Sequence, residues 1–188
     1  MKDNRRSFIK KSSVGVLGIT MGMTAKSYAK IMGANDRVNI GVAGIRQQGF
    51  NHIRNYAALN NVEVMALCDV DSRLFPERLE WLKNNGGTVP KTYVDIRKLL
   101  ENKDIDAISV ATPNHWHALA GIWAAQAGKH STLEKPGTHN VFEGRQLIRA
   151  AERYGVLIQH PAERRWFPGF KSAVEFLRHG GLGEVYLA

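Results

Sequence analysis

The stretch that decides the fold is Val38–Asn51, which reads VNIGVAGIRQQGFN. An apolar, β-type run ends at Gly44, a tight turn follows, and a pattern with helical periodicity begins near Gln48. This strand-turn-helix order is the context in which a dinucleotide-binding fingerprint works. In that fingerprint the first glycine makes the turn, the second admits a pyrophosphate to the backbone, and the third lets helix and strand pack closely. The stretch therefore predicts a nucleotide-binding turn.

One position departs from the fingerprint. Gly44 and Gly49 occupy the first and third glycine positions, but Arg46 stands in place of the second. A side chain there obstructs the approach of a phosphate unless the turn opens outward, whereas its guanidinium could meet a phosphate directly. We expect Gly44, Ile45, Arg46 and Gly49 to contact the cofactor. The alternative is an ordinary glycine-containing turn between a strand and a helix.

An acidic residue follows the next predicted strand, Val62–Cys68. Asp69 comes about 20 residues after Gly49, where the fingerprint places a carboxylate for the ribose. A carboxylate there accepts the ribose hydroxyls and repels a 2′-phosphate, so NAD is favoured over NADP as the cofactor. The alternative role is a helix cap. We assign Asp69 to the ribose and Asp71 to the cap of the following helix.

Apolar strands alternate with helical segments along the rest of the chain, as in a parallel sheet covered by helices. The expected fold is α/β, a Rossmann-type doubly wound parallel sheet with right-handed crossovers. After the first strand, the expected strands are 62–69, 91–94, 105–111, 131–134 and 156–160, and the expected helices are 48–59, 72–84, 96–101, 118–127 and 141–154.

Polar residues follow several of these strands, at the edge of the sheet where such folds bind ligands. Lys135 could hold a substrate hydroxyl and pass a proton as hydride leaves the carbon. Its alternative is a surface lysine paired with Glu134, which we also place at the cofactor site. His115 and His117 either cap the following helix and pack beneath the loop, or line the nicotinamide side of the cleft.

The first 29 residues resemble a targeting signal rather than part of the fold. Arg5 and Arg6 form a twin arginine, Val14–Met23 is a short apolar core, and Ser27–Ala29 is a small-x-small cleavage site. These features predict a twin-arginine signal over 1–29, with export to the periplasm. The segment is too short to span a bilayer as a stable helix. The alternative is a basic amphipathic anchor that stays attached.

Composition excludes several other functions. The formal charge is +9, but residues 1–29 carry +5 of it, and the remaining +4 is spread without a long basic run. We therefore expect no nucleic-acid partner. Cys68 is the only cysteine, so no intramolecular disulfide can form, and its place at a strand end predicts a buried thiol. Seven histidines are present without a Cys or acidic cluster to complete a ligand set, so no metal site is expected.

Four motifs, taken together in order and spacing, resemble a known family. They are Gly44-x-x-x-x-Gly49, Cys68–Asp71 (CDVD), Ala111–His117 (ATPNHWH) and Glu134–Pro136 (EKP). From about Arg37 to its end, the chain is similar to the N-terminal half of the glucose-fructose oxidoreductase, inositol dehydrogenase and MocA family, and most of all to its twin-arginine-exported members.

The resemblance implies a nicotinamide-dependent oxidoreductase that transfers hydride to or from a sugar or polyol. In the family's motif, Lys135 is the residue that contacts the reacting hydroxyl, and Pro136 is a cis-proline that shapes the turn. Four further residues are implied to lie near the cofactor: Thr112, Pro113, Asn114 and His117.

Members of that family continue into a second, α+β substrate domain. Residues 30–161 would then be the NAD(P)-binding domain, and 162–188 the start of the second, with a linking helix at 168–179 and a first strand at 183–188. We therefore expect a truncated sequence that is inactive alone and homo-oligomeric only at full length. The alternatives are a non-catalytic NAD-binding module or relic, and an NAD-dependent glycosidase or epimerase of the same family.

Overall fold

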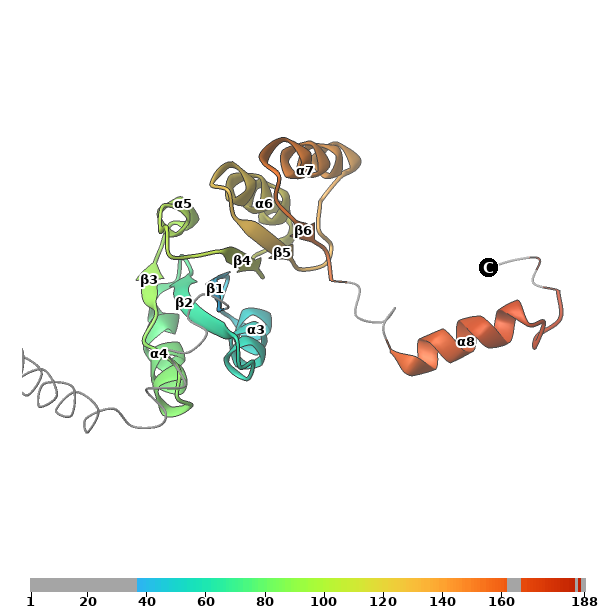
Figure 1. Ribbon diagram of the computed structural model, residues 1–188, viewed down its shortest axis with the longest axis horizontal. Helices are drawn as coiled ribbons and strands as arrows, with labels where there is room; N and C mark the ends of the chain where they lie inside the picture. Colours follow the sequence, from blue (N-terminus) through green and yellow to red (C-terminus); the bar gives the residue numbers. More distant parts are fainter. Residues whose placement is uncertain (1–36, 162–166, 185, 187–188) are drawn as a thin grey trace, which may run out of the picture. The chain divides into compact units, whose positions relative to one another are not determined.

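The computed structural model of the chain describes residues 37–161, 167–184 and 186. Its core is one six-stranded sheet with the order β3-β2-β1-β4-β5-β6, in which every pair of neighbours is parallel (Figure 1). The strands are β1 (Val38–Ala43), β2 (Val62–Cys68), β3 (Lys91–Tyr93), β4 (Ala107–Val110), β5 (His130–Leu133) and β6 (Ile158–Gln159). This is the doubly wound order, and the chain reverses direction across the sheet between β1 and β4.

Helices connect these strands. They are α3 (Gln47–Ala57), α4 (Phe75–Asn84), α5 (Ile96–Leu100), α6 (His117–Gln126) and α7 (Val141–Tyr154), with short 3₁₀ turns η2 (Ser72–Leu74) and η3 (Asn114–Trp116). A further helix, α8 (Pro168–Arg178), follows the sheet in sequence. Within the described part of the chain, no helix is long and apolar enough to cross a membrane.

The helices cover both faces of the sheet, as Figure 1 shows. On one face, Phe50 and Ile53 of α3 and Leu82 of α4 pack against Val42 and Leu67 of the sheet. On the other face, α5, α6 and α7 contribute a second cluster with the alternate strand residues, among them Ala43, Ala66, Ile108, Val110 and Leu133. Since side chains alternate along a strand, β1 and β2 feed both clusters, which explains their nearly continuous apolar sequences.

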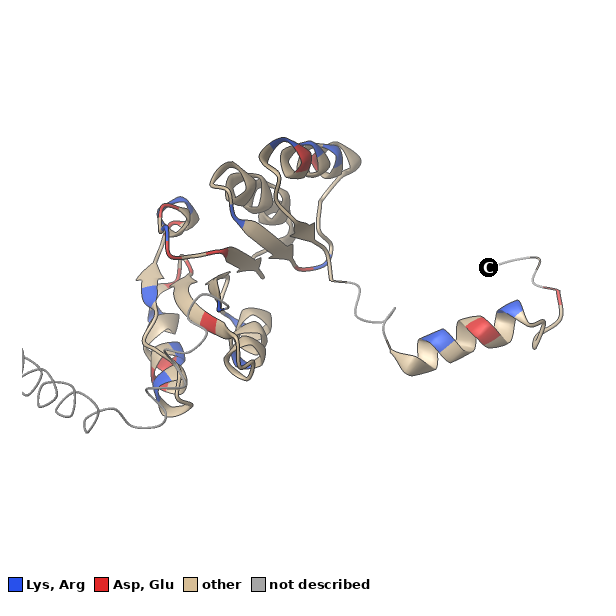
Figure 2. Ribbon diagram, in the orientation of Figure 1, with Lys and Arg blue, Asp and Glu red and all other residues tan. Residues whose placement is uncertain are grey.

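Helix α6 has contacts on several sides and is accordingly uncharged. It contacts β4, β5, α5 and α7, and Figure 2 shows it without a blue or red segment, whereas α5 and α7 both carry charged residues. Gly121 permits this packing, because a Cβ atom there would lie 2.8 Å from Leu147 of α7 and 2.9 Å from Leu133 of β5. On α4 and α7, basic and acidic residues are interspersed, whereas α5 carries only Arg97 and Lys98 (Figure 2).

The expected α/β order is confirmed, while several boundaries differ. Helix 72–84 begins as the 3₁₀ turn η2, because the Asp71 side chain accepts from the backbone of Arg73 and caps the segment there. The expected strand 105–111 is shorter and pairs only over Ala107–Val110. A helix was expected at 168–179, and α8 spans Pro168–Arg178. The expected strand at 183–188 includes residues outside the described part of the chain.

Candidate functional site

The turn after β1 requires both of its glycines. Gly44 has φ +79°, and a Cβ atom on it would lie 2.6 Å from the carbonyl oxygen of Ala111. A Cβ atom on Gly49 would lie 1.7 Å from the carbonyl oxygen of Gly44. No side chain can occupy such space, so the two glycines allow α3 to begin directly against the end of β1.

The first turn of α3 has the properties of an anion site. No side chain of the described residues caps this helix, whose N-cap position is Arg46. The first backbone N–H groups of a helix have no partner within it, and the helix dipole favours negative charge at that end. A pyrophosphate at this turn would accept from those groups, which is how dinucleotide-binding folds hold it.

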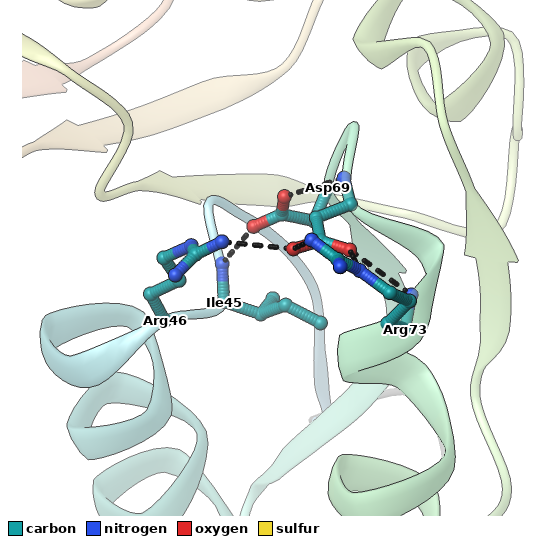
Figure 3. Close-up of polar contacts among 5 residues, drawn as sticks. Ile45, Arg46, Asp69 and Arg73 are labelled. Carbon is teal, nitrogen blue, oxygen red and sulfur yellow. Dashed lines mark hydrogen bonds and ion pairs between the residues drawn. The ribbon is translucent and has the colours of Figure 1, made fainter.

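Arg46, in the position of the second glycine, points away from the turn. Its Nη2 donates to Asp71 Oδ2 over 2.8 Å, and its side chain is 70% exposed (Figure 3). A separate cavity of about 560 Å³ is lined by Arg46, Gln47, Gln48, Leu74 and Arg78.

Asp69 is held by two backbone donors. Its Oδ2 accepts from Ile45 N–H over 2.9 Å, and its Oδ1 accepts from Asp71 N–H over 2.9 Å (Figure 3). The carboxylate therefore ties the turn after β1 to the end of β2. Each oxygen retains a second lone pair, so the group can still accept two ribose hydroxyls. Ile45 itself is fully buried, and only its backbone takes part.

A cavity of about 480 Å³ lies beyond the carboxyl ends of β1, β2 and β4, at the point where the strand order reverses. Ligands of doubly wound folds bind at such a switch point, and the volume is typical of a small-molecule site. The lining residues are Ala43, Gly44, Cys68, Asp69, Val70, Val94, Asp95, Ile96, Arg97, Thr112, Pro113, Trp116, Ala120 and Trp123.

Two further features of the cavity lining suit a dinucleotide. Thr112 Oγ1 is buried and has no hydrogen-bond partner among the described residues, so it offers a donor and an acceptor to a bound molecule. Trp116 and Trp123 lie with ring centroids 6.3 Å apart, and the Arg97 guanidinium lies 5.8 Å from the Trp123 ring. An aromatic pair and a planar cation provide stacking surfaces for a base.

His117 occupies a structural position at the start of α6. It is buried, and its ring nitrogens lie 2.7 Å from the carbonyl oxygens of Pro136 and Thr112. It thereby joins the loop after β4 to the loop after β5. His115 and Asn114 are exposed on η3.

The turn after β5 contains Glu134, Lys135 and Pro136, and the Lys135–Pro136 peptide bond is cis. Glu134 is buried, and its Oε2 accepts from Lys135 N–H over 3.0 Å. Lys135 is exposed. Among the described residues, no ion pair joins the Lys135 amine to Glu134, so this cation is available at the surface of the turn.

The structure brings only part of the expected set into one cavity. Gly44, Asp69, Thr112 and Pro113 line it, whereas the turn with Glu134 and Lys135 lies at the end of β5 and is not part of that lining. The sequence alone did not indicate Trp116, Trp123 or Val94–Arg97 as lining residues. A Thr-Pro-Asn loop with tryptophans near the following helix was the available signal.

Two other expectations concern Cys68 and metals. Cys68 is buried as expected, and burial together with the charge of Asp69 raises its thiol pKa to about 12. The thiol is thus neutral and a poor nucleophile. Within the described residues, no group of three or more His, Cys, Asp or Glu side chains is arranged to hold a metal ion.

Comparison with known proteins agrees with this geometry. Residues 38–160 match the family described as "Oxidoreductase family, NAD-binding Rossmann fold" (GFO_IDH_MocA). The chain is 31% identical over 172 residues to a glycosyl hydrolase family 109 protein of Shewanella pealeana, an alignment that covers 81% of this chain and 38% of that protein. The chain thus spans well under half the length of this curated relative.

Solved structures share the fold. The KijD10 3-ketoreductase of Actinomadura kijaniata, solved as a variant with TDP-benzene and NADP, has TM-score 0.67 and 26% identity over 79% of this chain and 46% of its own. The WlbA dehydrogenase of Bordetella pertussis, solved with NADH and UDP-GlcNAcA, has TM-score 0.67 and 24% identity over 80% of this chain and 44% of its own. With its glycine turn and its sheet order in agreement, this chain belongs to the Gfo/Idh/MocA oxidoreductase family and contains its NAD-binding Rossmann domain.

Proposed function

We propose that the chain is the cofactor-binding half of an NAD-dependent oxidoreductase that transfers hydride between the nicotinamide and a carbon of a sugar or polyol. The observation that carries this proposal is the position of Lys135. It is an exposed cation at the carboxyl end of β5, on the same edge of the sheet as Asp69 and the phosphate turn. In its neutral form, the amine there can accept the hydrogen bond of a substrate hydroxyl and take up its proton as the hydride leaves.

Cofactor binding is tested first, with the chain as it stands. Trp116 and Trp123 line the cavity, so NADH bound there should quench tryptophan emission and accept energy from it. Trp116→Phe should reduce this transfer, whereas Trp81→Phe, which replaces a tryptophan outside the cavity, should leave it largely intact. Absence of saturable quenching by NADH would overturn the proposal.

Catalysis is tested on the gene product isolated from its own cells, after its intact mass has been measured. Purified protein with NAD⁺ and a panel of sugars and polyols should form NADH. Lys135→Met should lower kcat about a hundredfold with NADH affinity unchanged. Lys103→Met, which replaces a lysine in the loop that precedes β4, at the amino ends of the strands, should retain full activity. Equal rates for the two variants would exclude the assigned role of Lys135.

A glycosidase that oxidises its substrate transiently is the second candidate, and it is favoured by the name of the Shewanella pealeana relative. Such an enzyme returns the hydride to the product, so its NAD is not consumed. Release of the leaving group from an aryl glycoside, without net NADH formation and only with NAD present, would identify this activity.

We also propose that the protein is exported by the twin-arginine route to the periplasm. The support is the sequence around Arg5 and Arg6 and the small-x-small site at Ser27–Ala29. The intact mass of the isolated protein should match cleavage after Ala29. Replacing both arginines by lysine should leave the precursor in the cytoplasm, and export unchanged by that replacement would contradict the proposal.

A further inference from the structure

A partly buried polar network joins α3 to the ends of two strands. His52 of α3 lies with Nδ1 2.8 Å from Ser109 Oγ of β4 and with Nε2 3.0 Å from Glu134 Oε1, just after β5. Gln48, one turn earlier on α3, donates to the same Glu134 oxygen over 2.9 Å. The His52 and Glu134 side chains are only 12% and 11% exposed.

The sheet pattern explains how these groups meet. Ile108 and Val110 of β4 pack on the face covered by α5, α6 and α7, so Ser109 between them faces α3. Leu133 of β5 also packs on the α6 face, so Glu134 follows on the α3 side. Residues four apart on a helix lie on one face, which places Gln48 and His52 above both strand ends.

The network accounts for the hydrogen-bonding capacity of Glu134 almost completely. Burial opposes its ionisation, but the hydrogen bonds from Gln48, the Lys135 backbone and His52 outweigh it and lower the pKa of the carboxyl. With a proton on Nε2, His52 donates to Glu134, and its Nδ1 lies within hydrogen-bond distance of the Ser109 hydroxyl. Glu134 Oε2 meanwhile holds Lys135 N–H, so the carboxylate connects α3 to the backbone that carries Lys135.

We propose that His52 is a positioning residue, which fixes Glu134 and thereby the Glu134–Pro136 turn relative to the phosphate-binding helix α3. The predicted effect on NADH affinity rests on the proposed function, because it requires that α3 holds the cofactor and that the Glu134–Pro136 turn lies against it. A serine–histidine–carboxylate set is also the composition of a hydrolytic triad. Ser109 is 1% exposed, so no substrate reaches its hydroxyl, and the set serves to hold the turn.

Two substitutions of His52 separate its two contacts. In His52→Gln the side-chain amide reaches the position of Nε2 and can donate to Glu134, but the Ser109 contact is lost. In His52→Asn the amide reaches only the position of Nδ1, so the Ser109 contact is retained and Glu134 loses a donor. The first readout is hydrogen exchange at Lys135 N–H in the chain without ligand, and the second is NADH affinity.

We expect His52→Asn to speed exchange at Lys135 N–H about tenfold and to weaken NADH binding about tenfold, as loss of one hydrogen bond to a buried carboxylate implies. His52→Gln should stay within about twofold of the original chain in both. Gln48 is exposed, so Gln48→Met should leave folding intact, and it should speed the same exchange about threefold. Ile53→Val, a core change on the same helix, controls for general destabilisation and should alter neither readout.

The proposal is overturned if His52→Gln loses as much protection as His52→Asn, or if neither these variants nor Gln48→Met changes exchange at Lys135. If His52→Asn fails to fold, hydrogen exchange at Lys135 N–H in Gln48→Met and His52→Gln still tests the positioning role. If the original chain binds no NADH, the proposed function fails, while the exchange data continue to test the positioning role independently.

Discussion

The Arg46 guanidinium donates to the Asp71 carboxylate over 2.8 Å, and so joins the turn after β1 to the loop after β2. Arg73 also donates to Asp71, over 2.7 Å and 3.0 Å. These contacts, chiefly the hydrogen bond from Arg73, lower the pKa of Asp71 to about 2. Asp71 is therefore ionised at any ordinary pH and neutralises part of the charge of two arginines near Asp69 (Figure 3).

Asp71 should accordingly influence the choice of cofactor. In Asp71→Asn the two guanidinium groups lose their anionic partner and become available to a 2′-phosphate. We expect NADPH affinity to rise about five- to tenfold and NADH affinity to change by less than about twofold. Competitive titrations with NADH and NADPH measure both.

The matched control is Glu101→Gln, which also removes a carboxylate from an exposed ion pair, with Lys98, but away from the cavity. It should leave the ratio of the two affinities unchanged. If Asp71→Asn and Glu101→Gln gave the same ratio, Asp71 would have no part in discrimination.

Gly49→Ala should destabilise the chain severely, because its Cβ atom would lie 1.7 Å from the Gly44 carbonyl oxygen. Either the turn opens or α3 shifts away from β1, and we expect a loss of at least about 3 kcal/mol in the free energy of unfolding together with loss of NADH binding. Denaturant titration and NADH titration measure the two effects.

Gly169→Ala is the control for that substitution. Gly169 lies in α8, and a Cβ atom there would meet no heavy atom within 4 Å. Since alanine is the better helix former by about 1 kcal/mol, this variant should be as stable as the original chain or slightly more stable. A similar loss for both variants would show that packing at the turn is not the cause.

Cys68 provides a chemical probe of the cavity. Its buried thiol, with the pKa raised to about 12, stays protonated below that pH, and the thiolate is the reactive form. We expect alkylation by iodoacetamide at neutral or mildly alkaline pH to be at least about a hundredfold slower in the folded chain than in denaturant. Because Cys68 lines the cavity, bound NADH should slow the alkylation further. Mass spectrometry measures the fraction of Cys68 that has been alkylated. Rapid labelling of folded protein would contradict the burial.

Lys129 should affect stability and its dependence on pH. The amine is buried and donates to the carbonyl oxygens of Asn102 and Ile105 over 2.7 Å each. Lys129→Met leaves both carbonyls without this donor, so we expect the free energy of unfolding to fall by about 2–3 kcal/mol near neutral pH. Denaturant titrations measure this loss.

The pH dependence follows from the direction of the shift. Burial lowers the pKa of Lys129, so above that lowered value the unfolded chain binds more protons than the folded chain. The contribution of this group to the free energy of unfolding therefore rises with pH, from the folded pKa up to the unfolded value near 10.5. Lys129→Met should remove this contribution. An unchanged pH profile in the variant would show that the amine is not desolvated in the folded chain.

Much of the architecture follows from local sequence. The apolar runs of β1 and β2 predicted buried parallel strands, and the glycines at 44 and 49 predicted the turn that joins β1 to α3. The Asp69 carboxylate was identified by its spacing from that turn. Each of these signals depends on a few adjacent residues, because strand burial, a positive φ angle and a helix start are local requirements. The Asp71 cap was likewise identified locally. Strand limits were less accurate, since the end of strand pairing depends on partners elsewhere in the chain.

The network of His52, Gln48, Ser109 and Glu134 was not evident from the sequence. Its members come from α3, β4 and the end of β5, and they are separated by up to 86 residues. None belongs to a recognisable spacing pattern, apart from the one-turn separation of Gln48 and His52. The same holds for the contact of Arg46 with Asp71, because a sequence places an arginine in a turn without giving the direction of its side chain.

By itself, the amino-acid sequence determined the class of fold, the order of its strands and helices, the glycine turn after β1 and the position of Asp69 at the end of β2. These depend on periodicity, on glycine and on short spacings, which act through neighbours along the chain. Only the tertiary structure decided which face of the sheet receives Ser109 and Glu134, where Arg46 points, and which tryptophans line the cavity. Those choices depend on side chains from distant segments competing for the same space and the same hydrogen bonds once the sheet has formed.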